Sequence, residues 1–234
     1  MTPPIDDPEV LRRILANTDA LLLDFDGPIC SVFSGIPAHI VADQLRDILA
    51  EGGHAHFPEA VRTATDPFDI LFYAATLGPD EARYIEVAFT AHEVEAIQTA
   101  QPTPRADDLM RAWKATGRQL AIVSNNSRNA IEAYLALYNL QPSVDHIAAR
   151  TGPETSRLKP NPYLITQAGN ALTVRPDRCT LIGDSLTDIQ AATLANICAI
   201  GFANKSRKID RLSAFGAELL VTSIGEILAG LPAT

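Results

Sequence analysis

The sequence predicts a doubly wound α/β protein with a mainly parallel, Rossmann-like sheet and an inserted all-helical segment. Three observations predict it: short apolar runs end in a polar residue or glycine, helical patterns alternate with these runs, and one long stretch lacks such runs. Runs that are apolar on both faces suit parallel strands covered by helices on both sides. The alternation of strand and helix favours the doubly wound arrangement.

Four apolar runs are predicted to be strands. A polar residue or glycine follows each run, at the carboxyl edge of the sheet where open α/β sheets bind ligands. The predicted strands cover residues 20–23, 119–123, 179–182 and 196–200. Apolar residues at helical spacing predict helices over residues 128–137, 162–171 and 189–195.

The stretch between the first and second predicted strands contains no convincing apolar strand. Helical patterns there are separated by glycine and proline, which predicts helices over residues 38–50, 57–65, 67–77 and 79–100. We therefore expect an all-helical insert over residues 29–104, within a core domain formed by residues 1–28 and 105–234. The insert holds eleven acidic residues and three arginines, a net charge of −8 in a chain whose total is −9.

The composition and charge exclude several classes of function. A 234-residue chain with a net charge of −9 repels phosphate backbones and anionic lipid, so nucleic acid and membranes are not expected partners. Cys30, Cys179 and Cys198 lack the spacing of a metal site or a disulfide framework. The first residues lack the features of a signal peptide, and the apolar runs are far shorter than a membrane span. These features predict a cytoplasmic protein.

The first polar cluster is Asp24-Phe25-Asp26-Gly27, directly after the first strand. Residues i and i+2 at a strand end point to the same side, so both carboxylates can face the crevice beyond the sheet. Two carboxylates this close repel each other unless one is protonated or a cation lies between them, and Mg²⁺ prefers oxygen ligands. The alternative is a simple strand-end turn, because Asp-Gly is a common turn dipeptide.

Later strands and loops carry further polar residues. Asp184 and Asp188 follow the third strand, where capping of a helix N-terminus would explain one of them. Ser124 and Asn125 end the second strand, and Lys159 lies in a loop. Hydroxyl, amide and ammonium donors can hold the oxygens of a phosphoryl group. Singly, such residues are more often caps or solvated side chains.

Together, the motifs resemble the four-motif signature of the haloacid dehalogenase superfamily, specifically its magnesium-dependent phosphatase branch. In chain order they are Asp24-x-Asp-Gly, Ser124-Asn, Lys159-Pro and Gly183-Asp-Ser-x-x-Asp188. Gly201-Phe-Ala-Asn-Lys205 is similar to the loop after the family's fifth strand. The resemblance covers residues 20–229 if the insert is the family's helical cap, placed between the first and second motifs.

The resemblance implies a role for each motif residue. Asp24 would be the nucleophile that forms an aspartyl-phosphate, and Asp26 would protonate the leaving alcohol and then deprotonate the attacking water. Lys159 would offset the negative charge that Asp24 shares with the phosphoryl group. The substrate-binding residues would be Gly27, Ser124, Asn125 and Lys159.

The resemblance also implies a bound Mg²⁺ ion. Its ligands would be the Asp24 carboxylate, the Asp26 backbone carbonyl and Asp184, with Asp188 either a direct ligand or a neighbour of the ligands. An anionic nucleophile that attacks an anionic phosphate group needs such a cation, together with a lysine, to lower the electrostatic barrier.

The implied function is hydrolysis of a small phosphorylated metabolite by a phosphoglycolate-phosphatase-like enzyme, monomeric or homodimeric. Asp26 argues against carbon–halogen cleavage, and the insert lacks the lysine that phosphonatases use. A sugar-phosphate mutase-like phosphotransferase remains an alternative because its core chemistry is the same. A catalytically idle binding module is the other alternative, but it would have no need for clustered acids.

The insert contains other residues with more than one interpretation. His54 and His56 lack a third metal ligand at a recognisable spacing, which predicts an exposed loop pair. Arg46, Arg62 and Arg83 are expected to form ion pairs on helix surfaces, with substrate contact as the alternative.

Overall fold

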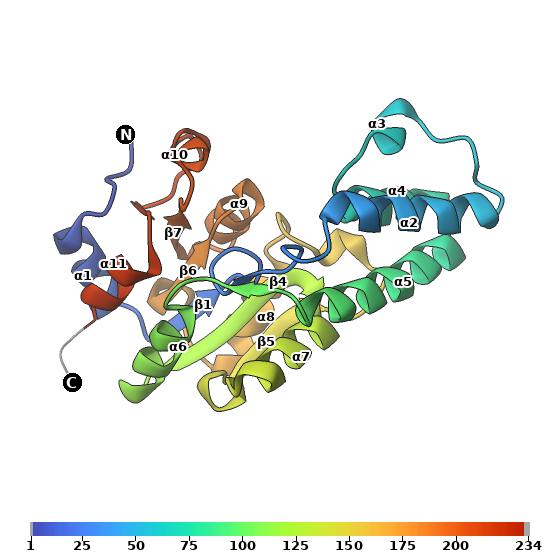
Figure 1. Cartoon of the computed structure of the whole chain (residues 1–234). Helices are drawn as coiled ribbons and strands as arrows, with labels where there is room; N and C mark the ends of the chain where they lie inside the picture. Colours follow the sequence, from blue (N-terminus) through green and yellow to red (C-terminus); the bar gives the residue numbers. More distant parts are fainter. Residues whose placement is uncertain (1, 232–234) are drawn as a thin grey trace.

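A six-stranded parallel sheet forms the centre of the computed structural model, which describes residues 2–231 (Figure 1). The strand order is β5–β4–β1–β6–β7–β8, and every neighbouring pair is parallel. The predicted Rossmann-like α/β class is therefore confirmed. The strands are β1 (Ala20–Leu23), β4 (Gln119–Ser127), β5 (His146–Arg150), β6 (Cys179–Gly183), β7 (Cys198–Phe202) and β8 (Leu219–Val221).

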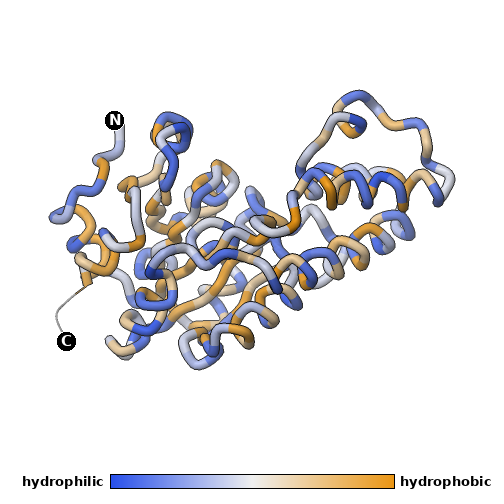
Figure 2. Tube along the Cα trace, viewed as in Figure 1, coloured by the Kyte–Doolittle hydropathy of each residue, from blue (hydrophilic) through white to orange (hydrophobic). Residues whose placement is uncertain are grey.

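Helices cover both faces of this sheet because successive strand residues point to opposite sides. In β1, Leu22 packs into one buried cluster, whereas Leu21 and Leu23 pack into the other. Figure 2 shows hydrophobic residues concentrated in the middle of the sheet. One face is covered by α1 (Pro8–Ala16), α6 (Ala106–Ala115), α7 (Arg128–Tyr138) and α11 (Ile224–Ala229), and the other by α8 (Tyr163–Leu172), α9 (Leu186–Leu194) and α10 (Ser206–Ser213).

The predicted insert forms a helical arm to one side of the sheet (Figure 1). It consists of α2 (Ala38–Glu51), α3 (Glu59–Arg62), α4 (Pro67–Leu77) and α5 (Pro79–Ile97). Within it, α4 packs against both α2 and α5. The division into a core domain and a separate domain over residues 29–104 stays a prediction.

Where the chain leaves and re-enters the core, β2 (Cys30–Ser31) pairs antiparallel with β3 (Gln101–Pro102). The expectation that this whole stretch lacks strands is therefore wrong. A pairing of only two residues on each strand leaves no alternation of apolar and polar residues for sequence analysis to detect.

Some predicted helix and strand ends are also wrong. The helix expected over residues 57–65 is a single turn, Glu59–Arg62. It starts late because a residue before proline, here Phe57, avoids the helical region, and farther along Asp66 adopts an extended conformation to cap α4. The strand expected from residue 196 begins at Cys198, because Asn196 has a left-handed backbone with a φ of 53°.

Short 3₁₀ turns lie in connecting loops, at Gln141–Ser143, Thr155–Arg157 and Pro176–Arg178. Among the helices of residues 2–231, every one is too short or too polar to cross a lipid bilayer.

Candidate active site

Asp24 lies at the carboxyl end of β1, on the floor of a cavity between the sheet and the helical insert. Its backbone N–H donates to the Ile182 carbonyl at 2.9 Å, which extends the pairing of β1 with β6. The residue is only 7% exposed. Its Oδ1 accepts from the Phe25 N–H at 2.8 Å and lies 2.8 Å from Lys159 Nζ. One carboxylate oxygen is thus held in place by two donors.

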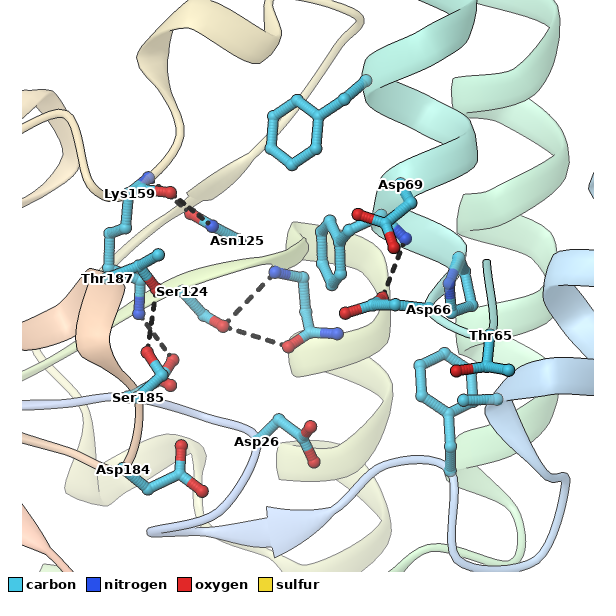
Figure 3. Close-up of a pocket in the computed structure, with 17 residues that line it drawn as sticks. Asp26, Thr65, Asp66, Asp69, Ser124, Asn125, Lys159, Asp184, Ser185 and Thr187 are labelled. Atoms are coloured by element: carbon cyan, nitrogen blue, oxygen red, sulfur yellow. Dashed lines mark hydrogen bonds and ion pairs between the residues drawn. The ribbon is translucent and has the colours of Figure 1, made fainter. Parts of the chain in front are cut away.

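The loop after Asp24 brings Asp26 and Gly27 next to Asp184. Asp26 Oδ1 accepts from the Val32 N–H at 2.9 Å. Gly27 has a φ of 109°, and a Cβ at this position would lie 2.3 Å from Asp184 Oδ2. Glycine is needed here both for its backbone conformation and for the close approach. Figure 3 shows Asp26 and Asp184 on the same side of the cavity.

Lys159 reaches the cavity floor from the loop before α8, and only 3% of it is exposed. Its Nζ donates to the Val123 carbonyl at 2.9 Å and lies 2.5 Å from Asp188 Oδ1. The Asn125 side chain holds the Lys159 backbone, because it accepts from the Lys159 N–H at 2.8 Å and donates to the Lys159 carbonyl at 3.1 Å. Both ends of the Asn125 amide therefore bind the Lys159 backbone and fix its position.

Asp188 is fully buried and both of its oxygens have partners. Besides the Oδ1 contact with Lys159, Oδ2 accepts from the N–H groups of Asp184 and Ser185 and from the Ser185 hydroxyl. Ser185 and Asp188 form the capping box at the start of α9. Asp188 thus fixes the loop that presents Asp184, while the Asp184 carboxylate pairs with Lys208 from α10.

The site contains more acidic than basic groups, namely Asp24, Asp26, Asp184 and Asp188 against Lys159 and Lys208. Burial, reinforced by the charge of Asp188, raises the pKa of Asp24 to about 8. Burial also raises the pKa of Asp26 to about 6 and increases that of Asp184. The lysines therefore do not neutralise the site fully.

A divalent cation fits this donor set. Carboxylate oxygens of Asp24, Asp184 and Asp188 lie within 4.8 Å of one another. Mg²⁺ prefers oxygen ligands, and its charge would stabilise the ionised form of Asp24, which burial and the charge of Asp188 disfavour. The chemistry of these side chains is thus compatible with the metal that the sequence motifs imply.

Ser124 lies at the same edge of the sheet, in β4, just before the pairing with β5 becomes irregular. Its hydroxyl donates to Asn126 Oδ1 at 3.1 Å and lines the cavity (Figure 3). The structure therefore brings all the candidate residues from the sequence motifs to one edge of the sheet.

The cavity has a volume of about 500 Å³ and is closed on one side by the helical insert. Figure 3 shows Asp66 and Asp69 on the α4 side, across from the residues of the core. The insert residues that line the cavity are Phe33, Ala38, Thr65, Asp66, Pro67, Phe68, Asp69 and Phe72. The insert therefore contributes three aromatic side chains, two carboxylates, one hydroxyl and two small apolar side chains to the cavity wall.

The arginines of the insert have other partners. Each of the three, Arg46, Arg62 and Arg83, pairs with the acidic residue three positions before it. This confirms the predicted helix-surface ion pairs for Arg62 and Arg83, whereas Arg46 is largely buried and also donates to the Val61 and Ala64 carbonyls. The prediction of an exposed histidine pair is wrong for His54, which is partly buried and lies 3.0 Å from Glu81, and is confirmed for His56, which is exposed.

Sequence analysis missed Asn126, Lys208 and the cavity residues of the insert. Asn126 directly follows the Ser124-Asn125 motif, but its partner Glu93 lies 33 positions earlier in the chain. Lys208 meets Asp184 from a helix 24 positions later. Such contacts leave no local signal. In the sequence, Asp66 and Pro67 indicate the start of a helix, but nothing there indicates that they line a cavity.

The chain belongs to the haloacid dehalogenase-like hydrolase family, which matches residues 18–196. It is 24% identical over 196 residues to the phosphoglycolate phosphatase of Psychrobacter arcticus, covering 78% of this chain and 82% of that protein. It is 32% identical over 125 residues to the plasmid phosphoglycolate phosphatase of Cupriavidus necator, covering 52% of each. With several curated phosphoglycolate phosphatases the similarity spans only about half of their length.

Among solved structures, the chain is similar to a haloacid dehalogenase family hydrolase of Deinococcus radiodurans that contains bound phosphate and sodium. The TM-score is 0.58 and the identity 27%, covering 93% of this chain and 100% of that one. The fold and the family match thus define a hydrolase of this family. Its curated relatives support a phosphoglycolate-phosphatase-like activity, the hydrolysis of phosphomonoesters.

Proposed function

We propose that this chain is a Mg²⁺-dependent phosphatase that hydrolyses small phosphomonoesters through an aspartyl-phosphate formed on Asp24. The observation that carries the proposal is the Asp24 carboxylate on the cavity floor, 2.8 Å from the buried ammonium of Lys159. An anionic nucleophile attacks an anionic phosphoryl group only where positive charge lowers the electrostatic barrier. Lys159 supplies such a charge from the protein itself.

The other core residues have complementary roles in this proposal. Asp26 delivers a proton to the leaving oxygen and later takes one from the attacking water. The Ser124 hydroxyl donates to a phosphoryl oxygen, and Gly27 lets the backbone pass close to the phosphoryl group. Asn125 contributes by holding Lys159 at its position.

Asp24, Asp184 and the backbone carbonyl of Asp26 would hold the Mg²⁺ ion. When bound, this ion supplies the positive charge that the site still needs beyond that of Lys159 and Lys208. Asp188 is predicted to act as a neighbour of the ligands, because its oxygens are already bonded to Lys159 and to the loop of Asp184.

Removal of divalent metal is expected to abolish activity. EDTA treatment should stop the release of phosphate from a panel of phosphorylated metabolites, and added Mg²⁺ should restore it. Mg²⁺ should also raise the Tm of the chain, because the cation binds the folded state and relieves repulsion between its carboxylates. Full activity without divalent metal, or no effect of Mg²⁺ on Tm, would contradict the proposed metal site.

The acidic insert is expected to select against polyanionic substrates. Asp66 and Asp69 line the cavity, whereas the insert arginines are paired elsewhere. A neutral or cationic leaving group avoids the repulsion that extra phosphates would meet, an effect screened beyond about 8 Å at physiological salt. Values of kcat/KM for matched mono- and polyphosphorylated substrates, at low and moderate salt, test this. A preference for the polyanion would refute it.

Cytoplasmic location and a monomeric or homodimeric state belong to the same proposal. Gel filtration of the purified chain with light-scattering detection would decide between one and two copies.

A further inference from the structure

A buried charge network joins the helical insert to the loop that carries Ser124. Arg150 ends β5, and its side chain is 1% exposed. Its guanidinium lies 2.5 Å from Glu86 and 2.5 Å from Glu93, both on α5. These two glutamates are seven residues apart, or two helical turns, and so share one face of the helix. Along this part of its length α5 lies beside α7 and β4 (Figure 1).

Glu93 makes contacts that Glu86 does not make. Its Oε2, besides meeting Arg150, accepts from the Ser127 N–H at 3.0 Å, and its Oε1 accepts from Asn126 Nδ2 at 2.9 Å. Glu86 instead accepts from the Thr90 hydroxyl of its own helix. Of the two glutamates, Glu93 therefore contacts the loop that follows Ser124 and Glu86 does not, while Arg150 itself donates from Nε to the Asn125 carbonyl at 3.2 Å.

The Glu93 carboxylate decides which way the Asn126 amide points. A carboxylate can only accept hydrogen bonds, so Asn126 must turn its NH₂ group toward Glu93. The amide oxygen then faces Ser124, whose hydroxyl donates to it at 3.1 Å. The backbone N–H of Asn126 also donates to Ser124 Oγ, at 3.3 Å. Ser124 Oγ is thereby fixed at two points.

We propose that Glu93, a residue of the insert, is a positioning residue for Ser124, and that Arg150 keeps the Glu93 carboxylate in place. The inference rests on the proposed function in one respect, that Ser124 binds the phosphoryl group. When a phosphoryl oxygen arrives, the Ser124 hydroxyl turns its hydrogen from Asn126 to that oxygen, while the Asn126 N–H keeps Oγ in position. The insert then contributes to phosphoryl binding in two ways, through the residues that line the cavity and through the contacts of Glu93 with Asn126 and Ser127.

Glu93→Asp and Glu86→Asp form a matched pair of variants. Each shortens one side chain by a methylene, keeps its charge and withdraws one carboxylate from Arg150. Glu93→Asp is expected to lower kcat/KM by about 10- to 10²-fold, because a displacement of about 1 Å at a binding group costs up to that much. Glu86→Asp should leave kcat/KM unchanged, although both variants lower the Tm. Equal losses of kcat/KM in the two variants would overturn the inference.

A cycle with Ser124→Ala separates positioning from general destabilisation. In the Ser124→Ala background, Glu93→Asp should cause no further loss of kcat/KM but should lower the Tm as it does in the wild-type background. Additive losses of kcat/KM would mean that Glu93 acts independently of Ser124, and would refute the proposal. Should Glu93→Asp fail to fold, Asn126→Ala enters the same cycle, with the same expected lack of additivity.

Measuring the binding of inorganic phosphate tests the positioning role of Glu93 separately from the proposed phosphatase activity. Calorimetric titration with phosphate in the presence of Mg²⁺ needs no turnover, and Glu93→Asp should weaken binding while Glu86→Asp does not. A wild-type chain that binds phosphate but hydrolyses no phosphomonoester would refute the proposed function alone. An active wild-type chain whose two variants bind phosphate equally would refute the positioning role alone.

Discussion

Asp24→Asn is expected to lower kcat by about 10⁴–10⁶-fold, the range seen when a nucleophile or its direct partner is removed from an enzyme. An amide is a poor nucleophile, so no aspartyl-phosphate can form. The substitution is nearly isosteric, and an amide oxygen can still accept from the Phe25 N–H and from Lys159. Rates of phosphate release from a Mg²⁺-supplemented metabolite panel measure the loss.

The control for this variant is Asp80→Asn, on the exposed start of α5, where the carboxylate's one ion pair within residues 2–231 is with Arg83. It removes one acidic charge from the insert and should leave kcat unchanged. The Tm of Asp24→Asn should be retained, because Lys159 keeps its contact with Asp188. Substantial turnover by a folded Asp24→Asn variant would place the nucleophile elsewhere.

Asp26→Asn is expected to slow hydrolysis by an amount that depends on the leaving group. General acid help is worth about 10²–10⁴-fold and matters most when the departing oxygen is basic. The raised pKa of Asp26, about 6 because of burial, brings its carboxyl closer to holding a proton near neutral pH. An alkyl phosphate should therefore lose far more kcat/KM than nitrophenyl phosphate, whose leaving group needs little protonation.

In the structure, Asp26→Asn can change proton transfer without disturbing the loop that holds the side chain. The Asp26 side chain holds its loop through one bond, from the Val32 N–H to Oδ1, and the oxygen of an asparagine can accept the same bond. A loss that is equal for alkyl and nitrophenyl substrates would instead assign Asp26 to holding the loop or the metal.

The sequence by itself determined the centre of the sheet and the residues at its carboxyl edge. β1 is apolar on both faces and β6 is apolar apart from Thr180, so their composition distinguishes them from loops. Asp24 and Asp184 are the first charged residues after these strands. Strand identity and strand end are local properties, encoded in a few consecutive residues. The start of α4 could also be predicted from the sequence, because Asp66 supplies an N-cap and Pro67 is favoured as the first helical residue.

Elements without such local patterns were decided only by the tertiary structure. β5 begins with His146 and ends with Arg150, so its apolar run is only three residues long, and it is a strand because it pairs with β4 at the sheet edge. α10 is polar along most of its length and is placed by contacts with α9 and β8. Sequence analysis predicted neither element.

The same division applies to the site. Asp24 and Asp26 could be predicted to act together because they lie two positions apart directly after an apolar run, although Asp26 belongs to the loop beyond β1 and that loop brings it to the cavity. The link from Arg150 through Glu93 to Asn126 could not be predicted, because Arg150 and Glu93 are 57 positions apart and meet where α5 packs against β4, next to the end of β5. Local spacing encodes which residues share a strand end, whereas the packing of helices on the sheet decides which distant charges neutralise one another.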